Sequence, residues 1–297
     1  MYIGEIIDHV RKQKGLTIKQ ICGEKISRTT YHRFVKEQSD TSIGNLTYLL
    51  QKVNLYYDEL KTFDYPENVN WINQIMKEIK QAFFSKDIDE LKRIQAFCSE
   101  QTIEIAEQQT KRVHMASLCD LLIAKLENKK FNVTCTEIYS YLINAQTWTR
   151  YELVLFNNCM YAFHAEFLES VLEKAVRGIG HYRGTGEGKS EGFRMLANAV
   201  IHFIQMHNLN SAWKYLEKMN NYPLSEEMFF EKSLKLIING IWECLRRNKK
   251  GNEKIKQGLQ VFKSLEAKNH YKMNVELIRF IEKRYGIEFD IVLDNHE

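Results

Sequence analysis

The sequence predicts an all-α protein in which a small helical bundle precedes a longer array of helices. Apolar residues recur mostly at intervals of three and four, and long segments contain no β-turn dipeptides. Only two prolines, Pro66 and Pro223, occur among 297 residues. This length favours two domains, and we place the boundary near Pro66, between residues 1–65 and 66–297.

Capping signals delimit the first two helices of the bundle. Residues 2–13 carry one apolar face, and Gly15 ends that helix well. Thr17 caps a second helix, with Gln20 at the position that a capping box requires. Gly23 permits a sharp exit. The apolar face of the first helix consists of Ile3, Ile6, Ile7 and Val10.

A third helix is expected over residues 28–36, after the cap residue Ser27. Tyr31 and Phe34 are three residues apart and would face the core. The outer side of the helix would then carry Arg28, Thr29, His32 and Arg33. A recognition helix presents such positions to the major groove of DNA.

Two further helices complete a five-helix domain of helix-turn-helix (XRE-like) type. Ser42 caps the fourth helix, and Tyr56, Tyr57 and Leu60 belong to the fifth. The separate caps of the second and third helices, with a glycine between them, favour this arrangement.

Basic residues concentrate in this first domain. Residues 11–36 contain eight lysines and arginines against one acid, Glu24, a net charge of +7 where the whole chain has +4. Such a local patch fits a nucleic-acid contact at one end of the protein. The alternative is an ordinary solvated basic face, and His32 fits a plain surface residue equally well. The candidate DNA-binding residues are Thr17, Lys19, Ser27, Arg28, Thr29, His32, Arg33 and Lys36.

The remaining chain reads as helical pairs with a unit of roughly 34–40 residues, the length of tetratricopeptide-like repeats. Such repeats stack into a curved array whose concave face suits an extended peptide or a partner helix. The expected helices cover residues 69–84, 87–99, 102–128, 134–146, 149–178, 191–207, 210–220, 225–248, 251–267 and 271–285.

Two of these helices carry polar stripes that such a face would need. Arg194, Asn198 and His202 follow one another at intervals of four, and Arg150 and Asn158 lie eight residues apart. Asparagine amides can pair with an extended peptide backbone, and arginine can hold a carboxylate. A solvated outer face is the alternative for both stripes.

The glycine-rich segment 178–192 contains a Gly-Lys-Ser sequence at 188–190 but is not a phosphate-binding loop. The motif requires a glycine five positions before Gly188, where Arg183 stands, and a preceding strand. The segment fits a flexible basic loop, able to act as a lid over a ligand, better than the phosphate-binding loop of a nucleotide-binding enzyme. No spacing typical of a catalytic or metal site occurs, so we expect no enzyme activity, no metal and no cofactor.

The six cysteines lack CxxC or finger spacing and predict free, mostly buried thiols in a reducing compartment. No apolar run approaches the ~18 residues of a membrane span, and the N-terminus does not resemble a signal peptide. We therefore expect a cytoplasmic protein without membrane contact.

The chain resembles the Rgg/MutR-type regulators, a branch of the peptide-responsive Rgg/Rap/NprR/PlcR/PrgX (RNPP) family, over nearly its whole length. The stretches that carry the resemblance are Gly4-x-x-Ile7-x-x-x-Arg11-Lys12-x-Lys14-Gly15, Ile26-Ser27-Arg28-x-x-Tyr31-x-Arg33-Phe34 with Ser39-Asp40, Trp148-Thr149-Arg150-Tyr151-Glu152-Leu153-x-Leu155-Phe156-x-Asn158, Leu196-x-Asn198-x-x-x-x-Phe203-Ile204, and 251–265. One departure is Val35-Lys36-Glu37, where the family usually continues Glu-Arg-Gly.

The resemblance implies a homodimeric cytoplasmic transcription regulator that binds double-stranded promoter DNA. A short signalling peptide would bind the concave face of the repeat domain and change activity, as in quorum sensing. Dimerisation is expected from the C-terminal helices. Residues carried over as peptide contacts are Arg150, Asn158, Arg194 and Asn198, and the stripe on the same helix adds His202. The alternative is a helical-repeat scaffold whose N-terminal bundle binds a partner protein.

Overall fold

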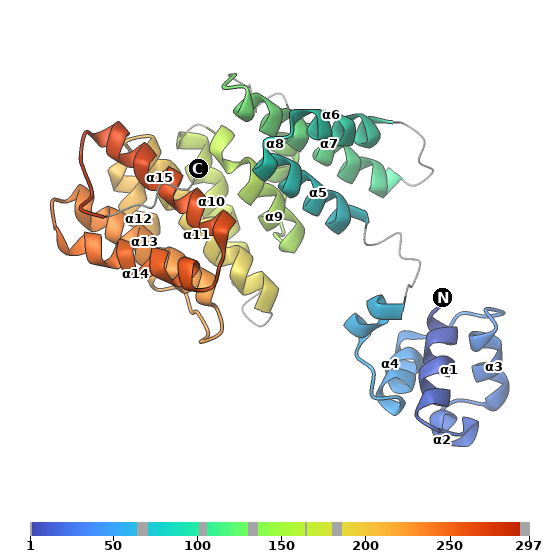
Figure 1. Ribbon diagram of the computed structural model, residues 1–297. Helices are drawn as coiled ribbons and strands as arrows, with labels where there is room; N and C mark the ends of the chain where they lie inside the picture. Colours follow the sequence, from blue (N-terminus) through green and yellow to red (C-terminus); the bar gives the residue numbers. More distant parts are fainter. Residues whose placement is uncertain are drawn as a thin grey trace. The chain divides into compact units, whose positions relative to one another are not determined.

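The computed structural model describes residues 2–63, 71–100, 106–129, 136–163, 165–179 and 186–291. Every regular element in these ranges is a helix (Figure 1), which confirms the predicted fold class. Contacts divide the chain into two compact units, Met1–Gln74 and Ile75–Glu297. The expected boundary between residues 65 and 66 lies outside the described residues. No described helix is long and apolar enough to cross a membrane.

The first unit is a five-helix bundle in which the predicted fifth helix is a 3-10 helix. Its core is formed by fully buried side chains from four of the helices, among them Ile7, Ile21, Tyr31 and Leu49. The elements are α1 (Ile3–Gln13), α2 (Ile18–Cys22), α3 (Arg28–Val35), α4 (Ile43–Lys52) and η1 (Tyr57–Phe63).

The predicted caps are confirmed. The Thr17 hydroxyl accepts from the Gln20 N–H at 3.2 Å, while the Gln20 side-chain oxygen accepts from the Thr17 N–H at 2.7 Å. Ser27 and Ser42 each accept from the backbone N–H three residues later. Gly23 has a positive φ of 53°, which allows the chain to turn sharply between α2 and α3.

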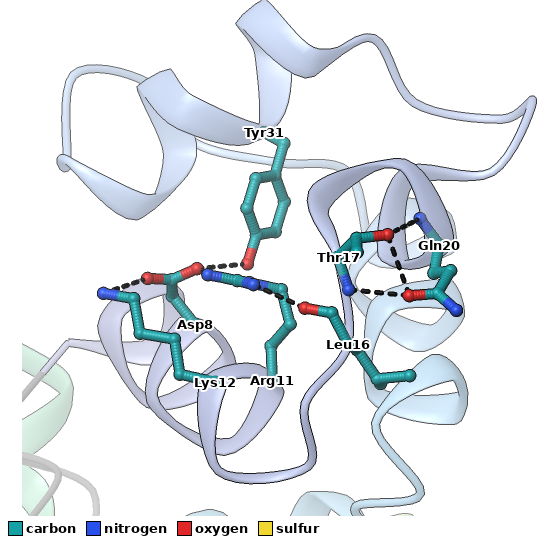
Figure 2. A network of polar contacts seen from close by, with 7 residues as sticks. All are labelled: Asp8, Arg11, Lys12, Leu16, Thr17, Gln20 and Tyr31. Atoms are coloured by element: carbon teal, nitrogen blue, oxygen red, sulfur yellow. Dashed lines mark hydrogen bonds and ion pairs between the residues drawn. The ribbon is translucent and has the colours of Figure 1, made fainter.

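A polar cluster around Asp8, which the sequence analysis did not anticipate, joins α1 to α3 (Figure 2). The Asp8 carboxylate accepts from Arg11 Nε at 2.7 Å, from Tyr31 Oη at 2.8 Å and from Lys12 Nζ at 2.9 Å. Arg11 also donates to the carbonyl of Leu16, in the turn before α2. One carboxylate therefore helps to fix three segments of the bundle relative to one another.

The end of α3 is a regular C-terminal cap despite its unusual sequence. The Gln38 N–H donates to the Arg33 carbonyl at 2.8 Å, and the Glu37 N–H donates to the Phe34 carbonyl at 3.1 Å. This is the Schellman pattern, in which Glu37 takes the left-handed conformation (φ 56°) that favours glycine. The departure at Val35–Glu37 thus keeps the geometry of the cap but adds backbone strain at Glu37.

The second unit consists of helices that pack mainly against their neighbours in sequence, in tetratricopeptide-like fashion (Figure 1). α6 packs on α7, α11 on α12, and α13 on α14, while α9, α11 and α13 lie side by side. The elements are α5 (Trp71–Ser85), α6 (Ile88–Ser99), α7 (Ala106–Leu126), α8 (Glu137–Asn144), α9 (Arg150–Cys159), η3 (Met160–Ala162), α10 (Ala165–Ile179), α11 (Gly186–Gln205), α12 (Leu209–Asn220), α13 (Phe229–Leu245), α14 (Lys250–Ser264) and α15 (Lys268–Tyr285).

Glycines allow α13 and α14 to approach closely. A Cβ atom on Gly240 would lie 2.5 Å from the Gly251 carbonyl oxygen, and one on Gly251 would lie 2.3 Å from the Gly240 carbonyl oxygen. Because both obstacles are backbone atoms, neither position accepts a side chain without moving a helix.

Two expectations for the second unit are wrong. The helix expected over 149–178 is broken after α9, because Phe163 adopts an extended backbone and its buried ring stacks against Phe167. The loop expected over 178–192 is shorter, because α11 already begins at Gly186. Residues 180–185, the central part of that proposed lid, lie outside the described residues.

The Asp8 cluster predicts an acid-sensitive first unit. Burial opposes ionisation of Asp8, but the hydrogen bonds from Arg11, Lys12 and Tyr31 outweigh it and lower the pKa from 3.8 to about 2. A lowered carboxyl pKa stabilises the folded state above the unfolded pKa, and this contribution is lost as the pH falls from about 4 to about 2. Asp8→Asn should therefore cost about 2 kcal/mol at pH 7 and reduce the acid dependence.

Hydrogen exchange at the amides of α1 and α3 measures this opening free energy within the full-length chain. Glu24→Gln, which neutralises an exposed acid of the same unit, is the control and should leave the exchange unchanged. Equal protection in the Asp8→Asn variant and the parent at pH 7 would show that the cluster contributes nothing.

Candidate functional sites

The outer face of α3 presents the side chains expected to contact DNA. All eight candidate residues of the first unit are exposed. Tyr31 is fully buried and Phe34 is half-buried, so α3 turns its apolar side to the core as its spacing predicts. Arg28, Thr29 and Arg33 consequently project from the opposite side.

Only half of the eight basic residues between 11 and 36 are without polar partners. Arg11 and Lys12 are bound to Asp8, Lys14 donates to the carbonyl of Val53, and Lys25 donates to that of Gly44. The other four side chains have no hydrogen bond or ion pair with any described residue: Lys19, Arg28, Arg33 and Lys36. These four charges lie on α2, on α3 and at the end of α3. The positive charge available to a ligand is therefore confined to a smaller region than the eight basic residues of the sequence suggest.

Two of the three hydroxyl groups among the candidates, those of Thr17 and Ser27, have structural roles. Thr17 forms the α2 capping box, and the Ser27 hydroxyl accepts from the Thr30 N–H and lies 2.8 Å from the Thr30 hydroxyl. Each cap marks a helix N-terminus, where the backbone N–H groups carry partial positive charge. These two residues can therefore place a helix end against a phosphate while their own oxygens remain bonded within the bundle.

In the second unit, a polar network connects α9, α11 and α13. Arg194 on α11 lies 3.3 Å from Glu231 Oε1 and 3.9 Å from Glu191 Oε1, and its guanidinium stacks 4.7 Å from the centre of the Phe230 ring. Glu231 is almost fully buried and also accepts a hydrogen bond from Ser190. Two carboxylates thus hold Arg194 in a fixed orientation.

Asparagines continue this network toward α9. Asn198 donates to the side-chain oxygen of Asn157 at 3.3 Å, and Asn157 donates to Glu191 Oε2 at 3.1 Å. The predicted residue Asn158 instead donates to the Val154 carbonyl in its own helix and is exposed. The α9 amide that faces α11 is therefore Asn157, one position earlier than the sequence stripe suggested.

The other two candidates of the second unit lie apart from the Arg194 network. Arg150 is the exposed first residue of α9. His202 Nε2 lies 3.3 Å from the Phe163 carbonyl oxygen, near η3. Burial, assisted by the nearby charge of Lys125, lowers the pKa of His202, so the imidazole is neutral at physiological pH.

Glu191 and Glu231 were not predicted, because no pattern in the sequence distinguishes them from surface acids. Each becomes significant only where α11 and α13 come together. Asn157 was detectable in principle, since it follows the apolar residue Leu153 by four positions within α9 and so shares its helical face.

Comparisons with known proteins agree with this architecture. The model of the family "HTH-type transcriptional regulator Rgg, C-terminal domain" matches residues 95–274. The SHP pheromone receptor Rgg2 of Streptococcus dysgalactiae is 19% identical, with a TM-score of 0.75 over 94% of this chain and 99% of that one.

Two further solved structures share the fold. A Listeria monocytogenes EGD-e protein assigned as a transcriptional regulator is 21% identical, with a TM-score of 0.79 over 96% of this chain and 99% of that one. A bacterial peptide pheromone/receptor complex is 16% identical, with a TM-score of 0.69 over 94% of this chain and 98% of that one.

The network around Arg194 predicts energetic coupling between α11 and α13. Arg194→Gln and Glu231→Gln, made singly and together, should show a coupling free energy of about 1–2 kcal/mol. The value is modest because the Arg194 side chain is 37% exposed and its charge is screened by solvent. Urea unfolding followed by tryptophan fluorescence measures it.

The matched control is Arg177→Gln, which removes an exposed arginine of α10 and should add to Glu231→Gln without coupling. Simple additivity of Arg194→Gln and Glu231→Gln would mean that the ion pair does not stabilise the packing of the two helices.

Proposed function

Because the chain belongs to the family of HTH-type transcriptional regulators Rgg, we propose that it binds promoter DNA as a homodimer under the control of a short signalling peptide. The observation that carries the DNA-binding part is the group of four basic side chains on α2 and α3 that have no partner among the described residues. Two of them, Arg28 and Arg33, lie on α3, where the burial of Tyr31 turns the basic side of the helix outward.

Each of these groups suits a particular contact with duplex DNA. Arg28 and Arg33 lie on the exposed side of α3 and can pair with guanine in the major groove, whereas Thr29 can contact a thymine methyl group. Lys19, Lys36 and the capped starts of α2 and α3 suit phosphates on either side. His32 is exposed on the same helix and would lie at the edge of this contact.

The peptide-binding part of the proposal rests on the relatives and on the polar network. One relative is described as a pheromone receptor and another as a peptide pheromone/receptor complex. Asn198 and Asn157 place amides between α9 and α11, where they could pair with the backbone of an extended peptide. We propose that the peptide crosses this face, with Arg150, Asn158, Arg194 and His202 as the further contacts.

The homodimer is proposed from the family, since two copies of a helix-turn-helix unit read two half-sites of a near-palindromic promoter. A DNA target also implies action in the cytoplasm of a bacterial cell. Sedimentation equilibrium would show a mass about twice the 35.2 kDa of one chain if the proposal is correct.

Removing the two arginines of α3 tests the DNA-binding proposal. Arg28→Ala with Arg33→Ala should weaken binding to a duplex selected from a random-sequence pool by about 100-fold or more, because two base contacts are lost. The slope of log affinity against log salt should change little in this variant and fall by about two in Lys19→Ala with Lys36→Ala, which removes two phosphate contacts. Fluorescence anisotropy over a salt series measures both quantities.

The matched control is Arg246→Ala with Arg247→Ala, which removes two exposed arginines from the end of α13. If the α3 variant binds DNA as tightly as this control, the recognition-helix assignment is incorrect. Protein that selects no duplex at all, yet retains a partner protein through the bundle, would favour the scaffold alternative.

Peptide titration tests the sensor proposal. Asn198→Ala and Arg194→Ala should each reduce the affinity for an octapeptide selected from an aliphatic pool by about tenfold, the effect of one hydrogen bond to a partly buried group. Calorimetry gives the Kd, and circular dichroism checks the helix content. Asn210→Ala, an exposed amide on α12, is the control. Unchanged affinity in the first two variants would place the peptide elsewhere.

A further inference from the structure

Lys125, on α7, is enclosed by aromatic rings rather than by acids. Its ammonium group lies 3.8 Å from the centre of the Tyr161 ring on η3 and 5.5 Å from that of Phe83 on α5. Two other elements, α5 and η3, therefore each place a ring beside this lysine, whose side chain is nonetheless exposed to solvent.

No carboxylate among the described residues pairs with this lysine. The surrounding protein removes part of its hydration and lowers its pKa to about 8, without an opposing acidic charge. At neutral pH it therefore remains largely a cation, partly dehydrated on the side of the two rings and still exposed to solvent. Such a group gains more from an added anion than a fully hydrated surface lysine does.

Further polar atoms beside Lys125 lack partners. The Tyr161 hydroxyl is buried and forms no hydrogen bond with a described residue. His202 lies close enough for the charge of Lys125 to influence it, and its Nδ1 atom is buried without such a partner as well. Because the neutral imidazole of His202 uses its one N–H toward the Phe163 carbonyl, its Nδ1 can only accept. The donors with unused capacity are therefore the ammonium of Lys125 and the phenol hydroxyl of Tyr161, near the end of α11 that carries His202.

Nearer the start of α11, by contrast, the cation already has acidic partners. There Arg194 stands against two carboxylates, Glu191 and Glu231. The rise of a helix places residue 202 about 12 Å beyond residue 194, a span that about four residues of an extended peptide cover. The face of α11 therefore runs from an arginine that two carboxylates already neutralise to a lysine that no described carboxylate neutralises.

We propose that Lys125, assisted by the Tyr161 hydroxyl, binds a carboxylate of the signalling peptide near the His202 end of α11 and so fixes the direction in which the peptide lies along this helix. This inference rests on the proposed function and adds the charge of the ligand and its orientation. A single carboxylate fits better than a phosphate, because the site offers one cation and one neutral donor rather than an arginine fork or several backbone N–H groups.

The test uses the full-length protein and three pools of octapeptides built from Leu, Ile, Val, Phe, Gly, Ser and Thr. One pool has a free C-terminal carboxylate, the second is amidated, and the third is amidated but contains one Glu. Retained peptides are identified by gel filtration and mass spectrometry, and calorimetry gives the Kd of the best matched pair. The third pool distinguishes a side-chain carboxylate from the chain terminus.

We expect at least a tenfold preference for one of the two carboxylate-bearing pools over the amidated pool. That preference should disappear in Lys125→Met and survive in Lys125→Arg. Lys111→Met is the matched control, because Lys111 is an exposed lysine on the same helix, 5.9 Å from the centre of a tyrosine ring, and the variant should keep the preference. Tyr161→Phe should weaken the preference several-fold by removing only the hydroxyl.

Binding without any preference for a carboxylate, or a preference that persists in Lys125→Met, would overturn the inference and leave the sensor proposal intact. If the parent protein retains no peptide from any pool, the sensor proposal fails and this inference fails with it.

Discussion

The hydrogen bond between Tyr31 and Asp8 is the constraint on which the outward orientation of Arg28 and Arg33 depends. Tyr31 is fully buried and its hydroxyl reaches a carboxylate of α1, so α3 has one rotational setting about its own axis. Because that setting turns Tyr31 inward, Arg28 and Arg33 face outward. Arg11 and Lys12 neutralise the carboxylate that anchors the tyrosine, so these two charges serve the bundle and not a ligand.

In the second unit, charged side chains instead join helices that are well separated in the sequence. Glu231 of α13 holds Arg194 of α11, and the absence of side chains at Gly240 and Gly251 lets α14 pack directly against the backbone of α13. α11 is thereby joined to α13, and the Arg194 side chain is already oriented by two carboxylates. Such preorganisation favours binding, since little side-chain freedom is lost when a ligand arrives.

The two units therefore illustrate one rule for locating function among charged residues. Several of the cations discussed already have a partner: Arg11 and Lys12 share Asp8, and Lys14 and Lys25 bind carbonyl groups. The cations of α3 and Lys125 have no such partner among the described residues. A charge that folding does not use is available to a ligand, and the two sets point to a polyanion in the first unit and a carboxylate in the second.

The sequence by itself determined the helical class, the caps at Thr17, Ser27 and Ser42, and the outward side of α3, because these depend on residues three or four apart in one helix. Only the tertiary structure decided that Asp8 pairs with Arg11 and Lys12, two of the eight basic residues of the patch, that Asn157 rather than Asn158 faces α11, and that the chain leaves its helix at Phe163. The spacing of apolar residues does not mark the break at Phe163. The chain leaves the helix there because the Phe163 ring packs against residues of other segments, such as Tyr139. Local hydrogen bonding can be read along a chain, whereas the partner of a buried ring or charge depends on which distant helix folds against it.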